Sequence, residues 1–138
     1  MSFVKTSGTI QSLKIGRLTL IRDWLDEMDV KNYDIDENLN INANNVSLNN
    51  RHIAEFPDFI QFNKIYGWFD MGFNFFTSLK GCPIEIAETF YCWDNKISSL
   101  EYSPRKVGEG YFFGRQTRQF TTKEISDICV VGGLIISI

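Results

Sequence analysis

The sequence predicts an α+β protein with a short β-solenoid of about three to four coils, an N-terminal helix and strands, and a C-terminal helix-strand cap. Three observations lead to this fold class: a segment that repeats with a period near 21 residues, an amphipathic segment before it, and a helix-start signature after it. The chain has 138 residues, which is enough for one domain to bury a core without a metal or a disulfide.

The repeat is an alignment of residues 69–79 with residues 90–100, which lie 21 positions apart. Both segments fit the frame φ-x-φ-x-x-N-x-φ-x-x-φ, where φ is apolar, and they place Asn74 and Asn95 at the same point. A period of 21 lies within the 20–29 residues of leucine-rich repeats, and the frame follows their consensus. The sequence therefore indicates a leucine-rich-repeat-like solenoid.

Two further copies flank these segments. One begins at Tyr111, has Gln116 at the Asn position and then decays, while an earlier copy ends over residues 48–57. In each copy φ-x-φ is a short strand with alternate residues pointing inward, and the Asn side chain can bond backbone groups that the following turn leaves unpaired. Because one coil cannot bury its apolar edge alone, the coils must stack.

The N-terminal region changes its period along the chain. Residues 1–18 are weakly patterned, and we expect a flexible lead or an irregular strand that Ile10, Leu13 and Ile15 could anchor. A helix is expected over 19–28, because its apolar residues form one stripe: Leu20, Ile21, Trp24, Leu25 and Met28. Three short strands should follow, around the pairs Tyr33 and Ile35, Leu39 and Ile41, and Val46 and Leu48.

The C-terminal region reads as a cap. Thr121 and Glu124 form a capping-box pattern, which predicts a helix over 122–129. Gly132 and Gly133 then turn the chain, and residues 134–138 can add a last strand. The expected organisation is a lead over 1–18 and one domain over 19–138, comprising an N-terminal cap (19–47), repeats (48–120) and a C-terminal cap (121–138).

Composition argues against nucleic acid and membrane as partners. The net charge is −3, whereas binding to phosphates is driven by an excess of basic residues. The longest apolar run, 128–138, is broken by two glycines and is shorter than the roughly 18–20 residues of a membrane span. The first eight residues have no apolar core, so we expect no signal peptide. Three cysteines are too few for a disulfide framework, which favours a reduced, cytoplasmic protein.

The sequence contains no motif for catalysis, and we expect no enzyme activity, metal or cofactor. One His and three Cys without CxxC spacing give no zinc set. We interpret Cys82 and Cys92 as small core residues. His52 aligns with Phe73 and Asp94 on the exposed side of the turn, so a Cys–His pair is not indicated. A pairing of His52 with a thiol from another coil stays the open alternative.

The outward positions of the repeats form a candidate partner-binding surface. Three columns alternate with the inward residues: Asp70, Tyr91 and Phe112; Gly72, Trp93 and Gly114; and Phe73, Asp94 and Arg115. They hold four aromatics, two glycines that give the rings room, and three charged residues. Exposed aromatics and Arg are typical of binding sites. The proposed site is Phe73, Tyr91, Trp93, Asp94, Phe112 and Arg115. The alternative is that a second layer, or another copy of the chain, covers this face.

Several segments resemble short leucine-rich-repeat-like proteins of large tailed bacteriophages. The matching segments are Ser78-Leu-Lys-Gly-Cys-Pro83, Phe90-Tyr-Cys92, Ser98-Ser-Leu-Glu101, Ser103-Pro-Arg-Lys-Val-Gly108, Trp24-Leu-Asp-Glu-Met-Asp-Val-Lys-Asn-Tyr33 and Phe120-Thr-Thr-Lys-Glu-Ile125. The resemblance covers about residues 20–138. This chain departs from the pattern where aromatics replace leucines and where Thr117 and Arg118 occupy an apolar position of the third repeat.

The resemblance and the outward columns together predict a non-enzymatic protein–protein interaction module. It would be phage-encoded and act in the host cytoplasm, binding a host or phage protein as an inhibitor or adaptor through the strand face. Association of several copies is compatible with this hypothesis. The alternative is a structural component of the virion or its assembly. A hydrolase or nuclease is the third hypothesis.

Overall fold

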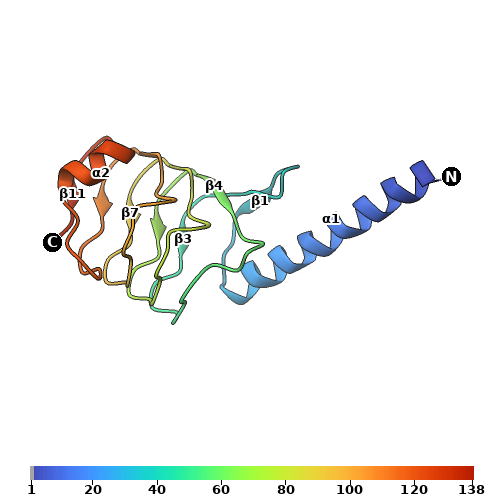
Figure 1. Ribbon diagram of the computed structural model, residues 1–138, viewed down its shortest axis with the longest axis horizontal. Coiled ribbons are helices and arrows are strands. Elements are labelled where there is room, and N and C mark those ends of the chain that lie inside the picture. Colours follow the sequence, from blue (N-terminus) through green and yellow to red (C-terminus); the bar gives the residue numbers. More distant parts are fainter. Residues whose placement is uncertain (1) are drawn as a thin grey trace.

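The computed structural model describes residues 2–138 and has the predicted α+β architecture: two helices and a β-solenoid (Figure 1). The helices are α1 (Ser2–Glu27) and α2 (Thr122–Ile128). The strands are β1 (Tyr33–Ile35), β2 (Ile41–Ala43), β3 (Val46–Ser47), β4 (Phe62–Ile65), β5 (Phe69–Asp70), β6 (Glu85–Ile86), β7 (Phe90–Tyr91), β8 (Lys106–Val107), β9 (Tyr111–Phe112), β10 (Val130–Val131) and β11 (Ile135–Ile136).

Two sheets run along the solenoid. Sheet A has the order β1-β2-β4-β6-β8-β10, and sheet B has the order β11-β9-β7-β5-β3. All neighbours pair in parallel except β1 and β2, which are antiparallel. In sheet B, Phe69 pairs with Phe90 and Phe90 with Tyr111, so the predicted 21-residue period is confirmed. Each turn of the solenoid contributes one strand to each sheet.

The solenoid has about five turns, more than the three to four that the sequence predicted. Both predicted caps contribute a turn of their own, because β2 and β3 form the first turn and β10 and β11 form the last. The last turn is longer than the repeat period, as the pairing of Ile135 with Tyr111 records. Only a search that allowed extra residues for α2 and its connections would have recovered this copy.

Helix α1 begins at Ser2, so residues 2–18 are helical, whereas the sequence predicted a flexible lead or an irregular strand. Before residue 27 only Gly8 and Gly16 weaken the helix, and the first proline of the chain is Pro57. Leu13 and Ile15 are exposed and anchor nothing, since this part of α1 projects away from the solenoid (Figure 1). The end of α1 does pack on the first turn: Trp24 is buried against Phe56, with 5.9 Å between the ring centroids.

The core runs the length of the solenoid and is built largely from aromatic rings. Phe69, Phe76 and Phe90 are fully buried at positions where the repeat consensus has leucine, as the sequence predicted. Consecutive rings touch along sheet B, where Phe90 packs edge-on against Tyr111 at 5.0 Å. Cys82 and Cys92 are buried among them, which confirms the prediction of small core residues.

Helix α2 confirms the predicted capping box. The Thr121 hydroxyl accepts a hydrogen bond from the Glu124 amide, and the Glu124 carboxylate accepts one from the Thr121 amide at 2.8 Å. Ile125 and Cys129 are buried, whereas Ile128, predicted on the same face, is 43% exposed. The helix ends at Ile128, and Cys129 already has an extended backbone. Ile128 is therefore the last helical residue and does not share a helix face with Cys129.

Candidate functional site

A ladder of buried amide side chains holds the turn that follows each strand of sheet B. The Oδ1 atom of Asn74 accepts hydrogen bonds from the amides of Arg51 and Ile53, at 2.9 and 3.1 Å. In the next turn, Asn95 Oδ1 accepts from the Phe76 amide at 3.0 Å, and Asn95 Nδ2 donates to the Met71 carbonyl at 3.0 Å. Each amide therefore joins two turns, as the repeat frame predicted, and it fixes the direction in which the strand residues point.

Gln116 continues this ladder in the third repeat. Its Oε1 atom accepts a hydrogen bond from the Ile97 amide at 3.1 Å, and its Nε2 atom donates to the Cys92 carbonyl. Among the described residues, every buried side-chain nitrogen or oxygen has a hydrogen-bond partner. The turns that follow the strands of sheet B are therefore held by hydrogen bonds from these amide side chains.

Alternation along the strands turns one residue in two outward from sheet B. Phe90 and Cys92 are fully buried, whereas Tyr91 between them is 37% exposed and Trp93 is half-buried. The same pattern makes Tyr111 buried and Phe112 half-buried. The sequence predicted this division of the aromatics into inward and outward sets, and the structure reproduces it.

The outward rings form one continuous apolar row. Tyr91 and Phe112 are partners in the ladder, and their ring centroids lie 5.3 Å apart at an interplanar angle of 34°. Ile136 pairs with Phe112 on the other side and extends the row to the last turn. We call Tyr91, Phe112 and Ile136 the sheet B row. The sequence pattern placed Ile136 in the C-terminal cap, so the predicted binding surface did not include it. The aliphatic run of residues 134–136 was the signal that could have identified it.

Trp93 lies beside this row over a glycine. A Cβ atom at Gly114 would overlap the carbonyl oxygen of Ile138 and would lie 2.8 Å from Cη2 of the Trp93 ring. Gly114 therefore leaves room for the ring, as expected, but the closer constraint comes from the backbone of the last turn. The role expected of Gly72 is not confirmed: its nearest atom is the Trp93 backbone carbonyl oxygen at 3.1 Å, rather than the ring.

The third column lies at the corner where the chain leaves sheet B. Phe73, Asp94 and Arg115 have φ values of 55°, 58° and 59°, a left-handed conformation that non-glycine residues seldom adopt. Phe73 is 48% exposed. Asp94 and Arg115 form an ion pair with 3.4 Å between Oδ2 and a guanidinium nitrogen. These charged groups border the aromatic row and leave its centre uncharged.

His52 does not occupy the position expected from the alignment. The equivalent of Phe73 in the preceding turn is Asn50, whose amide donates to the Gly72 carbonyl as the Phe73 amide donates to that of Trp93. His52 stacks instead on Phe75, with 5.8 Å between ring centroids. The error arose because the first spacing in sheet B is longer than the repeat period, as the pairing of Val46 with Phe69 records.

The buried thiols are poor nucleophiles. Burial raises the pKa of the Cys82 and Cys92 thiols far above its ordinary value, and burial raises that of Cys129 to about 11. In the described part of the chain, no group of three or more His, Cys, Asp or Glu side chains could hold a metal ion. No helix within residues 2–138 has the length and apolar character needed to cross a membrane.

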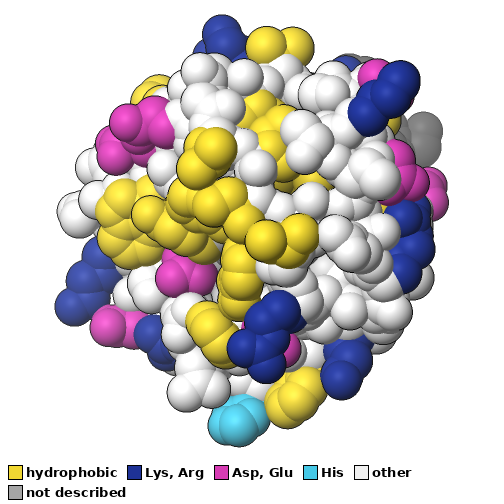
Figure 2. Space-filling model, turned by 90° about the vertical axis from the view of Figure 1, so that its left-hand side faces the viewer, with side chains coloured by type: hydrophobic (Ala, Val, Ile, Leu, Met, Phe, Trp, Pro, Cys, Tyr) yellow, Lys and Arg dark blue, Asp and Glu magenta, His cyan; other side chains and the backbone are white. Residues whose placement is uncertain are grey.

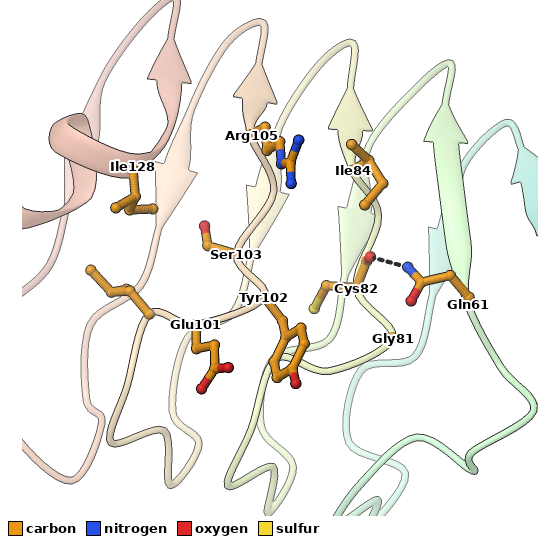
Figure 3. Close-up of a pocket in the computed structure, with 10 residues that line it drawn as sticks. Gln61, Gly81, Cys82, Ile84, Glu101, Tyr102, Ser103, Arg105 and Ile128 are labelled. Carbon is orange, nitrogen blue, oxygen red and sulfur yellow. Dashed lines mark hydrogen bonds between the residues drawn. The ribbon is translucent and has the colours of Figure 1, made fainter.

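A pocket of 330 Å³ lies on the opposite flank, between the return loops and the start of sheet A (Figure 3). Gln61 Nε2 donates to the Cys82 carbonyl across its wall at 2.9 Å. The Arg105, Glu101 and Tyr102 side chains are exposed, and Figure 3 shows that they do not converge on one point. This pocket lacks an arrangement of groups that would bind or activate a ligand.

The fold and the outward rows define a solenoid repeat protein with an aromatic strand face. Comparisons of the chain with protein-family models, curated protein sequences and solved structures found no match.

Proposed function

We propose that the protein is a non-enzymatic interaction module that binds another protein through the outer face of sheet B. The observation that supports this proposal is the sheet B row, in which Tyr91, Phe112 and Ile136 stand in register on consecutive strands. Trp93 widens the row on one side. A partner that covers this row gains apolar burial. It loses little to the ordering of the side chains, because strand pairing already holds the three residues in register.

The borders of this face suit a protein partner. Interfaces are commonly apolar at the centre and polar at the rim, and Trp, Tyr and Arg dominate their energetics. Here the Asp94–Arg115 ion pair and the exposed Phe73 lie at the corner column, next to the rings. The resemblance to phage solenoid proteins suggests a host or phage protein as the partner, bound in the host cytoplasm.

Paired alanine variants test this function. Tyr91→Ala with Trp93→Ala should reduce capture of the partner from phage-infected cells at least tenfold, because truncating each hot-spot ring typically costs about 2 kcal/mol of binding. Lys64→Ala with Lys106→Ala changes exposed residues on sheet A, in the turns on either side of the Tyr91 turn, and should leave capture unchanged. Thermal unfolding of both variants confirms that each is folded.

Two outcomes would contradict the proposal. Capture that survives the sheet B variant but is lost in the sheet A variant would move the binding surface to the other sheet. Presence of the chain in purified phage particles, at the copy number of a structural subunit, would favour the alternative function of a virion component.

A further inference from the structure

The last turn that the structure describes, residues 130–138, has no further strand of residues 2–138 paired with its outer edge. Among the strands of residues 2–138, β10 and β11 each have a hydrogen-bonded neighbour on one side only. The amides of Val130 and Gly132 donate to the preceding turn, and the carbonyls of Leu134 and Ile136 accept from it. Because a strand's backbone groups alternate in direction, those of Val131 and Ile135 point toward the open edge.

This end is also apolar and uncharged. Val130, Leu134 and Ile138 are 70%, 62% and 75% exposed. There is no charged or proline residue between 128 and 138, although natural edge strands are usually protected by such residues. Figure 2 views the molecule from this side and shows apolar side chains gathered across it. Within residues 2–138, the outward backbone groups and the exposed side chains of the last turn therefore lack a partner.

We propose that this end binds the same end of a second copy of the chain, related by a two-fold axis through Gly132 and Gly133. The strands β10 and β11 are two residues each and flank these glycines on either side. A two-fold axis along the bisector of this corner places β10 of one copy antiparallel to β11 of the other. The unpaired groups of Val131 then meet those of Ile135 at both edges.

A second copy fits better than a single extended peptide. The open edge follows the bend from β10 to β11, so a straight strand could pair with only one of the two sheets. Another last turn has the same bend and satisfies both edges. Since residues 128–138 have no charged side chain, pairing β10 with β11 of a second copy brings no like-charged side chains together along these strands.

The opposite end of the solenoid explains why the assembly closes at two copies. There, α1 covers the core with Ile21, Trp24 and Leu25, and the last strand of sheet A is the antiparallel β1, whose exposed Asp34 is charged. The first edge of sheet B carries the polar Ser47 and lies next to an Asn-rich loop. An apolar end facing this polar end would not support head-to-tail stacking into a filament. The proposed dimer uses the backbone edge of β11, whereas the function proposed for sheet B uses the outward face, to which Ile136 of the same strand contributes.

Sedimentation of the purified chain tests the proposal over a concentration range of about 1 to 100 µM, where moderate association is measurable. We expect the native protein to be a dimer in the upper part of this range. Val130→Lys with Leu134→Lys should make it a monomer, and both side chains are exposed enough to change without loss of the fold. Leu20→Lys makes the same change at an exposed position on α1 and should leave the dimer intact.

Amide exchange of the native protein gives a second measurement. The amides of Val131 and Ile135 should be protected in the concentrated sample and exchange on dilution. A native monomer throughout the range, an open-ended polymer, or a dimer that survives the double lysine variant would overturn the proposal. Fast exchange of both amides in a confirmed dimer would place the contact elsewhere and would overturn it as well.

Discussion

The two sheets of the solenoid present opposite chemistry on the same two turns. On sheet A the outward residue of β6, Glu85, lies 3.7 Å from Lys106 and 3.8 Å from Lys64 in neighbouring strands, which makes a charged ladder. On sheet B the corresponding neighbours are Tyr91 and Phe112, whose rings are 5.3 Å apart. Behind them, Ile86 and Phe90 are equally buried.

This contrast distinguishes the inward residues, which stacking of the turns requires to be apolar, from the outward residues, which stacking does not constrain. Stacking of the turns requires inward apolar residues and hydrogen-bond partners for the backbone groups of the turns, and both sheets meet these requirements. The outward positions are not constrained by stacking, so an exposed aromatic row there calls for another explanation than the fold. Charged outward residues on sheet A need none, because exposed charge is the ordinary state of a protein surface.

The largest effect that we predict tests whether sheet B depends on its amide ladder. Asn95→Ala removes the acceptor for the Phe76 amide and the donor to the Met71 carbonyl in a buried site. We expect the free energy of unfolding to fall by about 2–4 kcal/mol, measured by urea denaturation, because two buried backbone groups lose their partners.

Asn45→Ala is the matched control. Its Oδ1 atom accepts from the Trp68 amide at 3.0 Å, but this site is exposed and water can replace the side chain. The expected loss is about 0.5–1 kcal/mol. Equal losses for the two variants would show that burial of the ladder does not support sheet B.

The second prediction concerns the corner that joins the two sheets. A Cβ atom at Gly108 would overlap the carbonyl oxygen of Ala87 in the preceding turn. Gly108→Ala should therefore force two turns apart and lower the free energy of unfolding by about 1–3 kcal/mol. At Gly16, in the projecting part of α1, a Cβ atom meets nothing within 4 Å.

Gly16→Ala should instead stabilise α1 by up to about 1 kcal/mol, because alanine loses less backbone entropy in a helix. Helical circular dichroism on heating measures this gain, and urea denaturation measures the loss at Gly108. A Gly108→Ala protein as stable as the native chain would mean that the corner tolerates a wider spacing of the turns.

The sequence was sufficient for the repeated inward residues and for β1 and β2, and insufficient for the later strands of sheet A. The frame around Asn74 and Asn95 is regular, because both stacking and turn satisfaction depend on it. The sheet A strands β6 and β8 are two residues long, as β7 and β9 of sheet B are, but they lie outside the frame around Asn74 and Asn95, so nothing in that frame marks them. What does recur is an aliphatic residue four positions before the sheet B strand, as Ile86 precedes Phe90.

The candidate site was predictable only in part, for the same reason. Alternation around Phe90 placed Tyr91 and Trp93 outward, since each neighbour of a buried strand residue faces the other way. Ile136 was missed because α2 stretches the spacing of the last turn beyond the repeat period. The position of His52 was wrong because the first spacing in sheet B also exceeds that period. Irregular spacing at both ends of the solenoid depends on tertiary packing and leaves little trace in a single sequence.

The third prediction compares the outward pairs directly. Double-mutant cycles to alanine at Tyr91 and Phe112, and at Glu85 and Lys106, measure the coupling across the same two turns. We expect about 0.5–1.5 kcal/mol for the ring pair and under about 0.5 kcal/mol for the exposed ion pair. Raising the salt to about 1 M should remove the second coupling and leave the first. A coupling at the ion pair that persists in high salt would contradict this division between the sheets.

The smallest effect that we predict lies outside both sheets and shows how an exposed charge can matter when it is well placed. A hydrogen bond from Arg118, and then one from the Thr121 amide, lower the pKa of Glu124 to about 2. Its unfolded-state pKa is higher, so its contribution to stability is fully present above about pH 5 and is lost as the pH falls toward 2. Glu124→Gln keeps the capping group but cannot titrate. Urea denaturation between pH 7 and pH 2 should give a flatter decline for this variant than for the native chain, and parallel declines would show that the Arg118 contact contributes nothing to acid stability.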